Sequence, residues 1–296
     1  MSNLKEVKGR IQSVESTQQI TKAMKMVAAS KLRKAQYQIT QMRPYFLKMS
    51  EIIQNISSSL QSEEIDNPYA EERAIDKVLL VVVSSDRGLC GAFNSSVFKY
   101  ARNLIDKKYT IQESSGNLYL LPIGKKSLEY FTKRNYHVIK DYSHLIEKLN
   151  FDDARETAEM IMDKFVKKAF DQVEIIYNEF KNVATQIIHN EQFLPIKDIS
   201  ADEVYGQKNI DYIYEPSQNY IFQELIPKSL KIQFYKTLLE SNASEHGSRM
   251  TAMDKATENA DELLKELKLT YNRTRQAAIT KEILEIVSGA DALVQE

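Results

Sequence analysis

An apolar stripe with heptad spacing runs through the first 60 residues and limits what this chain can fold into. Its apolar residues recur every three and then every four positions, which is typical of a helix that pairs with another helix in a coiled coil. They are Leu4, Val7, Ile11, Val14, Ala28, Leu32, Ala35, Ile39, Met42, Phe46, Met49, Ile53, Ile56 and Leu60. At ~1.5 Å per residue such a helix and its partner would each be roughly 85 to 100 Å long.

A second stretch poor in Gly and Pro, from about residue 228 to residue 294, supplies the partner helix. It begins either after Pro216 or at Pro227, because proline suits the first turn of a helix. Both helices attach to the same middle segment, so we expect an antiparallel pair that places Leu4 near residue 284. The last dozen residues would then project alone, and the earlier start moves this estimate by up to a dozen residues. The apolar face reads Ala256, Ala260, Leu264, Leu267 and Tyr271, then shifts by one position to Ile279, Ile283, Ile286, Ala290 and Leu293.

A polar interruption breaks the N-terminal stripe, and we expect the coil to rearrange there. One interpretation is that the polar seam fixes the helix register at a cost in stability. The other is that Lys22 and Met24 turn outward towards a third protein. The heptad positions are Gln18, Thr21 and Lys25, while the apolar Ile20, Met24 and Val27 lie off register.

The middle third changes from a helical period to the pattern of an α/β domain. Residues 77–84 form a continuous apolar, β-branched run, which is typical of a strand buried on both faces. A Gly-containing turn and an amphipathic helix follow, and the pattern recurs. We therefore predict an α/β fold, in which a Rossmann-like domain with a partly parallel sheet (residues 61–216) is inserted between coiled-coil helices (1–60 and 217–296). Further strands are expected over 117–123, 172–180, 184–195 and 211–215, and helices over 94–106, 125–133 and 151–170.

The sequence offers several candidate chemical groups, and none forms a catalytic constellation. Residues 84–94 follow a strand and open a helix, where nucleotide-binding folds hold phosphate, but the segment lacks both G-x-G-x-x-G and a Gly-Lys-Ser/Thr motif. A tight turn is the favoured interpretation. Cys90 near Arg87 is either a thiol of lowered pKa or, as we favour, a buried structural cysteine. The four histidines lack metal-ligand spacing. We expect no catalytic residue, no metal and no cofactor.

Charge and hydropathy bound the compartment and the partners. Residues 1–60 hold ten Lys or Arg against three Asp or Glu, about +7, whereas the whole chain is −1. A basic helix suits an acidic protein surface, a lipid or a nucleic acid, but no aromatic residues interleave with its basic ones, which disfavours nucleic acid. The longest apolar run, residues 78–83, is too short to span a bilayer. We expect a cytoplasmic chain that starts near Met1 without a signal peptide.

Several long motifs resemble the gamma-subunit family of F-type ATP synthases. They lie at residues 20–33, 85–91, 249–260, 271–280 and 285–290. The resemblance implies a non-catalytic rotor shaft that stands inside a ring of alternating alpha and beta subunits. It would couple ion-driven rotation of the c ring to the conformational cycle of the beta subunits. The α/β domain would contact the epsilon subunit and the c ring, on the cytoplasmic side of a bacterial inner membrane.

The resemblance also implies roles for individual residues. Lys22 and Met24 would contact the beta subunits, and the basic N-terminal helix would face an acidic loop there. Coupling roles are implied for Arg249, Arg275, Gln276, Thr280 and Glu285. One departure is the C-terminal end, where Asp291 and Glu296 replace the apolar tip of the family. Two alternatives remain at this stage: a Rossmann-like enzyme with helical arms, and a coiled-coil scaffold without a rotary role.

Overall fold

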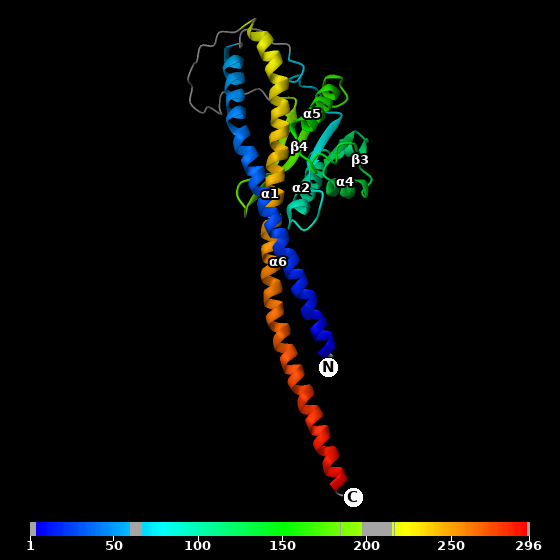
Figure 1. Cartoon of the computed structure of the whole chain (residues 1–296). Helices are drawn as coiled ribbons and strands as arrows, with labels where there is room; N and C mark the ends of the chain where they lie inside the picture. Colours follow the sequence, from blue (N-terminus) through cyan, green and yellow to red (C-terminus); the bar gives the residue numbers. More distant parts are fainter. Residues whose placement is uncertain (1–3, 60–66, 184, 197–214, 216, 295–296) are drawn as a thin grey trace. The chain divides into compact units, whose positions relative to one another are not determined.

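Two long helices dominate the computed structural model, which describes residues 4–59, 67–183, 185–196, 215 and 217–294. Helix α1 spans Leu4–Ser59 and helix α6 spans Gln218–Val294 (Figure 1). The chain divides into two compact units, Ala28–Arg249 and the combination of Met1–Val27 with Met250–Glu296. Both long helices therefore contribute to both units, and each unit is described by itself below.

The two long helices begin and end close to where the sequence predicts. Helix α1 is described to Ser59 and contains Pro44 in its interior, and the expected last residue, Leu60, lies outside the described residues. Of the two starts considered for α6, the one after Pro216 is confirmed, and the one at Pro227 is wrong. The Ser217 hydroxyl accepts a hydrogen bond from the Tyr220 amide (3.2 Å), which is the geometry of a helix N-cap. Pro227 is tolerated inside α6, where its neighbour Ile226 is buried.

The unit Ala28–Arg249 contains a five-stranded sheet in the order β3-β2-β1-β4-β5. Strand β1 pairs in parallel with both β2 and β4, β3 is parallel to β2, and β5 is antiparallel to β4. The partly parallel sheet predicted from the sequence is thus confirmed. The elements are β1 (Val78–Val83), α2 (Phe93–Lys108), α3 (Thr110–Ser114), β2 (Leu118–Ile123), α4 (Lys125–Thr132), β3 (His137–Val138), α5 (Phe151–Val166), β4 (Gln172–Phe180) and β5 (Gln186–Leu194).

Helices cover both faces of this sheet. Alternate residues of β1 point to opposite faces, and all six are buried, as expected for a central parallel strand. One face packs on α2 and α4 through Val97, Ala101 and Phe131. The other packs on α5 and on the long helices, with Met49 of α1 and Phe234 of α6 among the buried residues. Segments far apart in the sequence thereby share one core, and the α/β domain is attached to both long helices.

Several local details differ from the sequence-based expectations. The helix expected over residues 151–170 ends at Val166, and its N-cap is Asn150, whose side-chain oxygen accepts the Asp153 amide at 2.8 Å. The short elements α3 and β3 were not predicted. The strand expected over 211–215 lies outside the described residues except for Glu215, which is not in a strand.

The second unit is a two-helix coil. Its antiparallel pairing follows from the side-chain contacts, since Lys25 of α1 meets Asp254 of α6 and Glu15 meets Lys268. Beyond Thr274 every described side chain up to Ser288 is exposed, and α6 continues past the end of α1 (Figure 1). The projecting segment is longer than the predicted dozen residues because α6 starts at Gln218, which moves the residue opposite Leu4 towards the start of α6.

Candidate functional site

A layer of polar pairs occupies the seam of the two-helix coil. The Gln18 amide donates to the Asp261 carboxylate, the Thr21 and Thr257 hydroxyls lie 2.9 Å apart, and Lys25 Nζ lies 2.5 Å from Asp254 Oδ1. Thr21 is 8% exposed. The expected rearrangement of the coil is therefore wrong. The heptad register continues because each polar residue of α1 has a polar partner on α6.

Continuing the register turns apolar side chains of α1 away from the seam. Ile20, Met26 and Val27 are 59%, 68% and 57% exposed. Lys22 is exposed as well, whereas Met24 is half-buried beside the seam. Exposed apolar residues grouped on one helix are characteristic of a surface that contacts another protein. Of the two residues that the second interpretation of the polar interruption turns outward, Lys22 is exposed and Met24 is so only in part.

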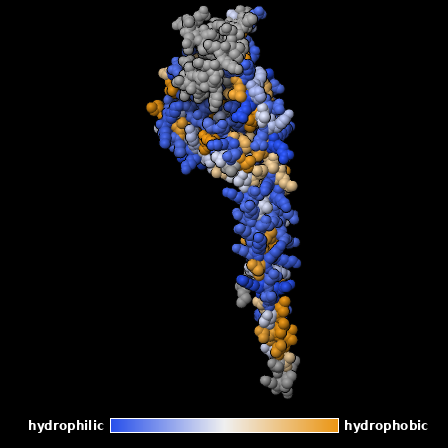
Figure 2. All heavy atoms as spheres, turned by 90° about the vertical axis from the view of Figure 1, so that its left-hand side faces the viewer, coloured by the Kyte–Doolittle hydropathy of each residue, from blue (hydrophilic) through white to orange (hydrophobic). Residues whose placement is uncertain are grey.

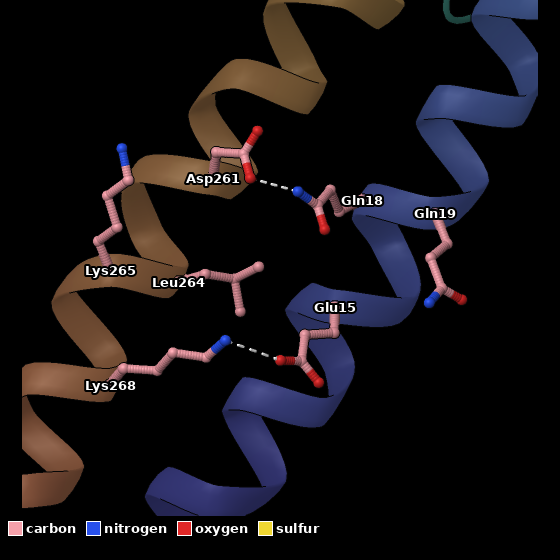
Figure 3. Close-up of a pocket in the computed structure, with 7 residues that line it drawn as sticks. All are labelled: Glu15, Gln18, Gln19, Asp261, Leu264, Lys265 and Lys268. Atoms are coloured by element: carbon pink, nitrogen blue, oxygen red, sulfur yellow. Dashed lines mark hydrogen bonds and ion pairs between the residues drawn. The ribbon is translucent and has the colours of Figure 1, made fainter.

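A shallow groove of about 410 Å³ lies between α1 and α6 next to the polar layer. Buried Leu264 lies between the two helices, and charged groups surround it (Figure 3). Lys268 Nζ of α6 pairs with Glu15 Oε1 of α1 at 3.2 Å, which crosses the groove on one side. Gln19 and Lys265 complete the rim. The groove offers charges of both signs, and this suits a polar side chain of a protein partner better than an apolar ligand.

The projecting part of α6 carries four of the residues to which the resemblance assigns coupling roles. Arg275, Gln276, Thr280 and Glu285 are all exposed, and Glu285 pairs with Lys281 at 3.5 Å. They lie about five turns or more beyond Thr257 along the helix, so the structure does not bring them together with Lys22 and Met24. Exposed apolar residues accompany them, and Figure 2 shows hydrophobic side chains gathered near this end. These residues are Ile279, Ile283, Leu284, Ile286 and Val287.

Arg249 belongs to the other unit and makes internal contacts. Its side chain is 12% exposed and forms an ion pair with Glu245 one turn earlier. It also donates hydrogen bonds to the backbone carbonyls of Arg87 (2.9 Å) and Gly88 (3.2 Å). Burial raises the pKa of Glu245, and the Arg249 guanidinium opposes that shift. Arg249 thus holds the turn after β1 against α6.

The turn after β1 is closed by its own side chains. The Ser85 amide donates to Asn94 Oδ1 (3.0 Å), and Asn94 Nδ2 donates to Ser85 Oγ (2.7 Å). Leu89 and Gly91 have φ values of 63° and 59°, the left-handed geometry of a tight turn. Cys90 is buried beneath it, as the structural interpretation predicted. The tight turn favoured from the sequence is confirmed.

The sequence alone did not identify Glu245, Gly247 and Ser248 as part of this contact. The available signal was a run of small residues inside a long helix, because small side chains permit close approach. A Cβ on Gly247 would lie 3.2 Å from the Phe180 ring at the end of β4. Among the residues that the structure describes, no group of three or more His, Cys, Asp or Glu side chains is placed to hold a metal ion. No described helix is long and apolar enough to cross a membrane.

A mixed α/β domain attached to two long helices, which pair as an antiparallel coil, defines a class of coiled-coil proteins with an inserted α/β domain. Comparison with known proteins identifies the family. The family model described as ATP synthase matches residues 3–293. The ATP synthase gamma chain of Cytophaga hutchinsonii is 58% identical over 294 residues, which is 99% of both chains, and that of Amoebophilus asiaticus is 50% identical over the full length of both. This chain therefore belongs to the ATP synthase gamma-chain family.

Solved structures show the same fold. A chain of the Tetrahymena thermophila mitochondrial ATP synthase central stalk and c ring matches with a TM-score of 0.56 and 25% identity, covering 80% of this chain and 99% of that one. A chain of the Euglena gracilis mitochondrial enzyme matches with a TM-score of 0.65 and 18% identity, covering 98% and 94%. Gamma chains are non-catalytic subunits, so the enzyme alternative is set aside.

Proposed function

We propose that this chain is the central shaft of an F-type ATP synthase. It stands within a ring of alternating alpha and beta subunits and couples ion-driven rotation of the c ring to the conformational cycle of the catalytic beta subunits. Family membership over the full length supports this role, as does the likeness to a central stalk. The observation that carries it is the exposed apolar surface of the unit formed by Met1–Val27 and Met250–Glu296.

The physical basis of the coupling is the unequal surface of this unit. A ligand shifts a conformational equilibrium only by its differential interaction with the two states. A shaft that presents Ile20 and Val27 on one side of α1 and charged residues on others offers a different surface to each of three surrounding sites. Moving one site from 1:99 to 99:1 requires about 5.5 kcal/mol of difference. A few apolar and charged contacts supply energy of that order, so rotation of the shaft cycles the sites in turn.

The contact roles of single residues belong to this proposal. We assign contacts with the beta subunits to Lys22 and Met24, supported by the exposure of Lys22 and of the apolar residues around it. Coupling roles fall to Arg275, Gln276, Thr280 and Glu285, supported by their position on the projecting part of α6. Arg249 has an internal role, supported by its contacts with residues 87 and 88.

The α/β domain has a separate role, which is to bind the c ring. We assign it a Rossmann-like character, supported by parallel pairing of β1 with β2 and β4. The division into a helix over 1–60, an α/β domain over 61–216 and a helix over 217–296 is part of the same proposal. Its partners are the epsilon subunit and the c ring, which places the chain as a peripheral subunit on the cytoplasmic side of a bacterial inner membrane.

Affinity purification of a tagged chain from bacterial membranes tests this function. We expect alpha and beta subunits to copurify in equal amounts as a ring. Ile283→Asp, which puts a charge on an exposed apolar residue, should reduce the recovery of the ring about tenfold or more. Glu282→Asp, at a neighbouring exposed position that is already charged, is the matched control and should leave it unchanged. Recovery of the chain alone, or equal ring recovery with both variants, would contradict the proposal.

A further inference from the structure

The sheet has a topological switch point between β1 and β4. From β1 the chain crosses to β2 on one side, and β4 lies on the other side of β1. In doubly wound sheets of this kind, ligands bind in the crevice at the carboxyl ends of the strands where the strand order reverses. Here the two segments that border this crevice are the turn over residues 84–92 and the end of β4 at Phe180.

The crevice is occupied by a segment of the chain's own helix α6. Ser248 Oγ donates to the Cys90 carbonyl oxygen at 2.7 Å, and Arg249 donates to the carbonyl oxygens of Arg87 and Gly88. On the β4 side, Gly247 approaches Phe180 so closely that a Cβ there would lie 3.2 Å from its ring. Three consecutive residues of α6 thus contact both borders of the crevice.

The backbone groups that the turn presents favour helix α6 as the occupant of the crevice and disfavour a phosphate. A phosphate site presents backbone N–H groups to the ligand, whereas this turn directs carbonyl oxygens of residues 87, 88 and 90 at α6. The Ser85 amide is already bonded to the Asn94 side chain. Asn178 of β4 reaches across to the Phe93 carbonyl (3.3 Å), which ties the second border to the first. Carbonyl oxygens favour a cationic donor, and Arg249 provides one.

We propose that the switch-point crevice is an internal binding site for α6, with Ser248 and Arg249 as positioning residues that lock the α/β domain to the helix. Other proteins with this sheet topology bind a nucleotide in the crevice. In this chain a segment of helix α6 fills it. The site is the joint at which the domain and this part of α6 rotate as one body. This last consequence rests on the proposed function, whereas the existence of the joint does not.

Hydrogen exchange of the purified full chain tests the joint directly. In Ser248→Ala, amides of the turn over residues 84–94 should exchange about fivefold faster, as expected for the loss of one hydrogen bond. Ser244→Ala is the matched control, because Ser244 Oγ is buried on the same helix and has no hydrogen-bond partner among the described residues. It should leave exchange of the turn unchanged. Equal exchange in the two variants and the wild type would overturn the joint.

Arg249 needs a second pair of variants, because its loss leaves Glu245 buried without a cation. We expect Arg249→Ala and Arg249→Lys, both made in a Glu245→Gln background, to accelerate exchange of the turn. The acceleration should be about thirtyfold for alanine and less for lysine, which lacks the forked guanidinium. If exchange in the alanine variant equals that in Glu245→Gln, Arg249 does not hold the turn against α6, and its role as a positioning residue is overturned.

The rotary consequence is tested in the assembled complex. Membrane vesicles carrying Ser248→Ala should pump fewer protons per ATP hydrolysed than those carrying Ser244→Ala, with ring recovery unchanged. The same difference is expected between Arg249→Ala in the Glu245→Gln background and Glu245→Gln alone. Faster exchange of the turn with normal pumping would show that the joint does not transmit rotation, and the joint would then be a structural contact only. Loss of the ring in the wild type would instead contradict the proposed function, so the two failures are distinct.

Discussion

His246 gives this protein a specific sensitivity to acid. The side chain is 8% exposed, and its Nδ1 is buried without a hydrogen-bond partner among the described residues. Burial, followed by the charges of Arg249 and of Lys31, lowers the pKa of His246 from 6.5 to about 4. Glu245 is the nearby carboxylate on the same helix, and burial raises its pKa. The imidazole of His246 is therefore neutral in the folded chain down to about pH 4.

The sign of the effect follows from the two pKa values of His246. The unfolded chain binds a proton at His246 as the pH falls through about 6.5, and the folded chain does so only near pH 4. Stability from the neutral imidazole is complete above pH 6.5 and is lost progressively down to pH 4. The shift corresponds to about 3 kcal/mol in the free energy of unfolding. Glu245 acts in the opposite direction, because its raised folded pKa favours the folded state as the pH falls.

Urea unfolding of the full chain at pH 7.5 and pH 4, followed by far-UV circular dichroism, isolates the contribution of His246. His246→Gln removes the titrating group and keeps a polar side chain of similar size. The variant should lose about 3 kcal/mol less stability than the wild type between the two pH values. His144→Gln, at an exposed position, is the control and should follow the wild type. Parallel pH profiles for the wild type and His246→Gln would refute the assignment.

Three further predictions concern the shaft and its crevice. Met24→Lys adds a cation beside the polar layer and should weaken coupling of hydrolysis to proton transport, whereas Met24→Leu should not; unchanged coupling in vesicles would exclude the contact with the ring. The purified chain should show no ATP binding by calorimetry, since α6 occupies the switch-point crevice, and micromolar affinity would be incompatible with that arrangement. Deletion of residues 290–296 should leave assembly intact, because the preceding segment already projects beyond the coil; complete loss of assembly would disprove a free tip.

The regular elements could be predicted because local pattern and tertiary burial agree in them. Strand β1 is apolar at every position because both of its faces are covered, and β4 has the bounds that its pattern predicts. Strand β3 has only two residues, too few to show a period. The start of α6 was ambiguous because Pro216 and Pro227 are both plausible first-turn residues, and only the Ser217 cap and the burial of Ile226 decide between them.

The contacts of the candidate site depend on distant parts of the chain, which a periodicity argument cannot supply. The polar residues of the seam suggested a rearrangement because Asp254, Thr257 and Asp261 were not recognised as their partners. The contacts of Arg249 were not foreseen for the same reason, since its carbonyl partners at residues 87 and 88 lie about 160 positions earlier. The family motifs supplied the candidate residues, whereas only the structure distinguishes outward-facing from internal ones.

The polar layer of the coil has a consequence for axial slippage under load. If α1 slid along α6 by one heptad, Thr21 would leave Thr257 and face Leu264, which is buried. A buried hydroxyl without a partner costs about 1 to 3 kcal/mol, and the hydroxyl of Thr257 would lose its contact as well. A purely apolar seam would tolerate such a step far better. Under load the two helices of this coil can therefore bend or twist, but they do not slide past each other.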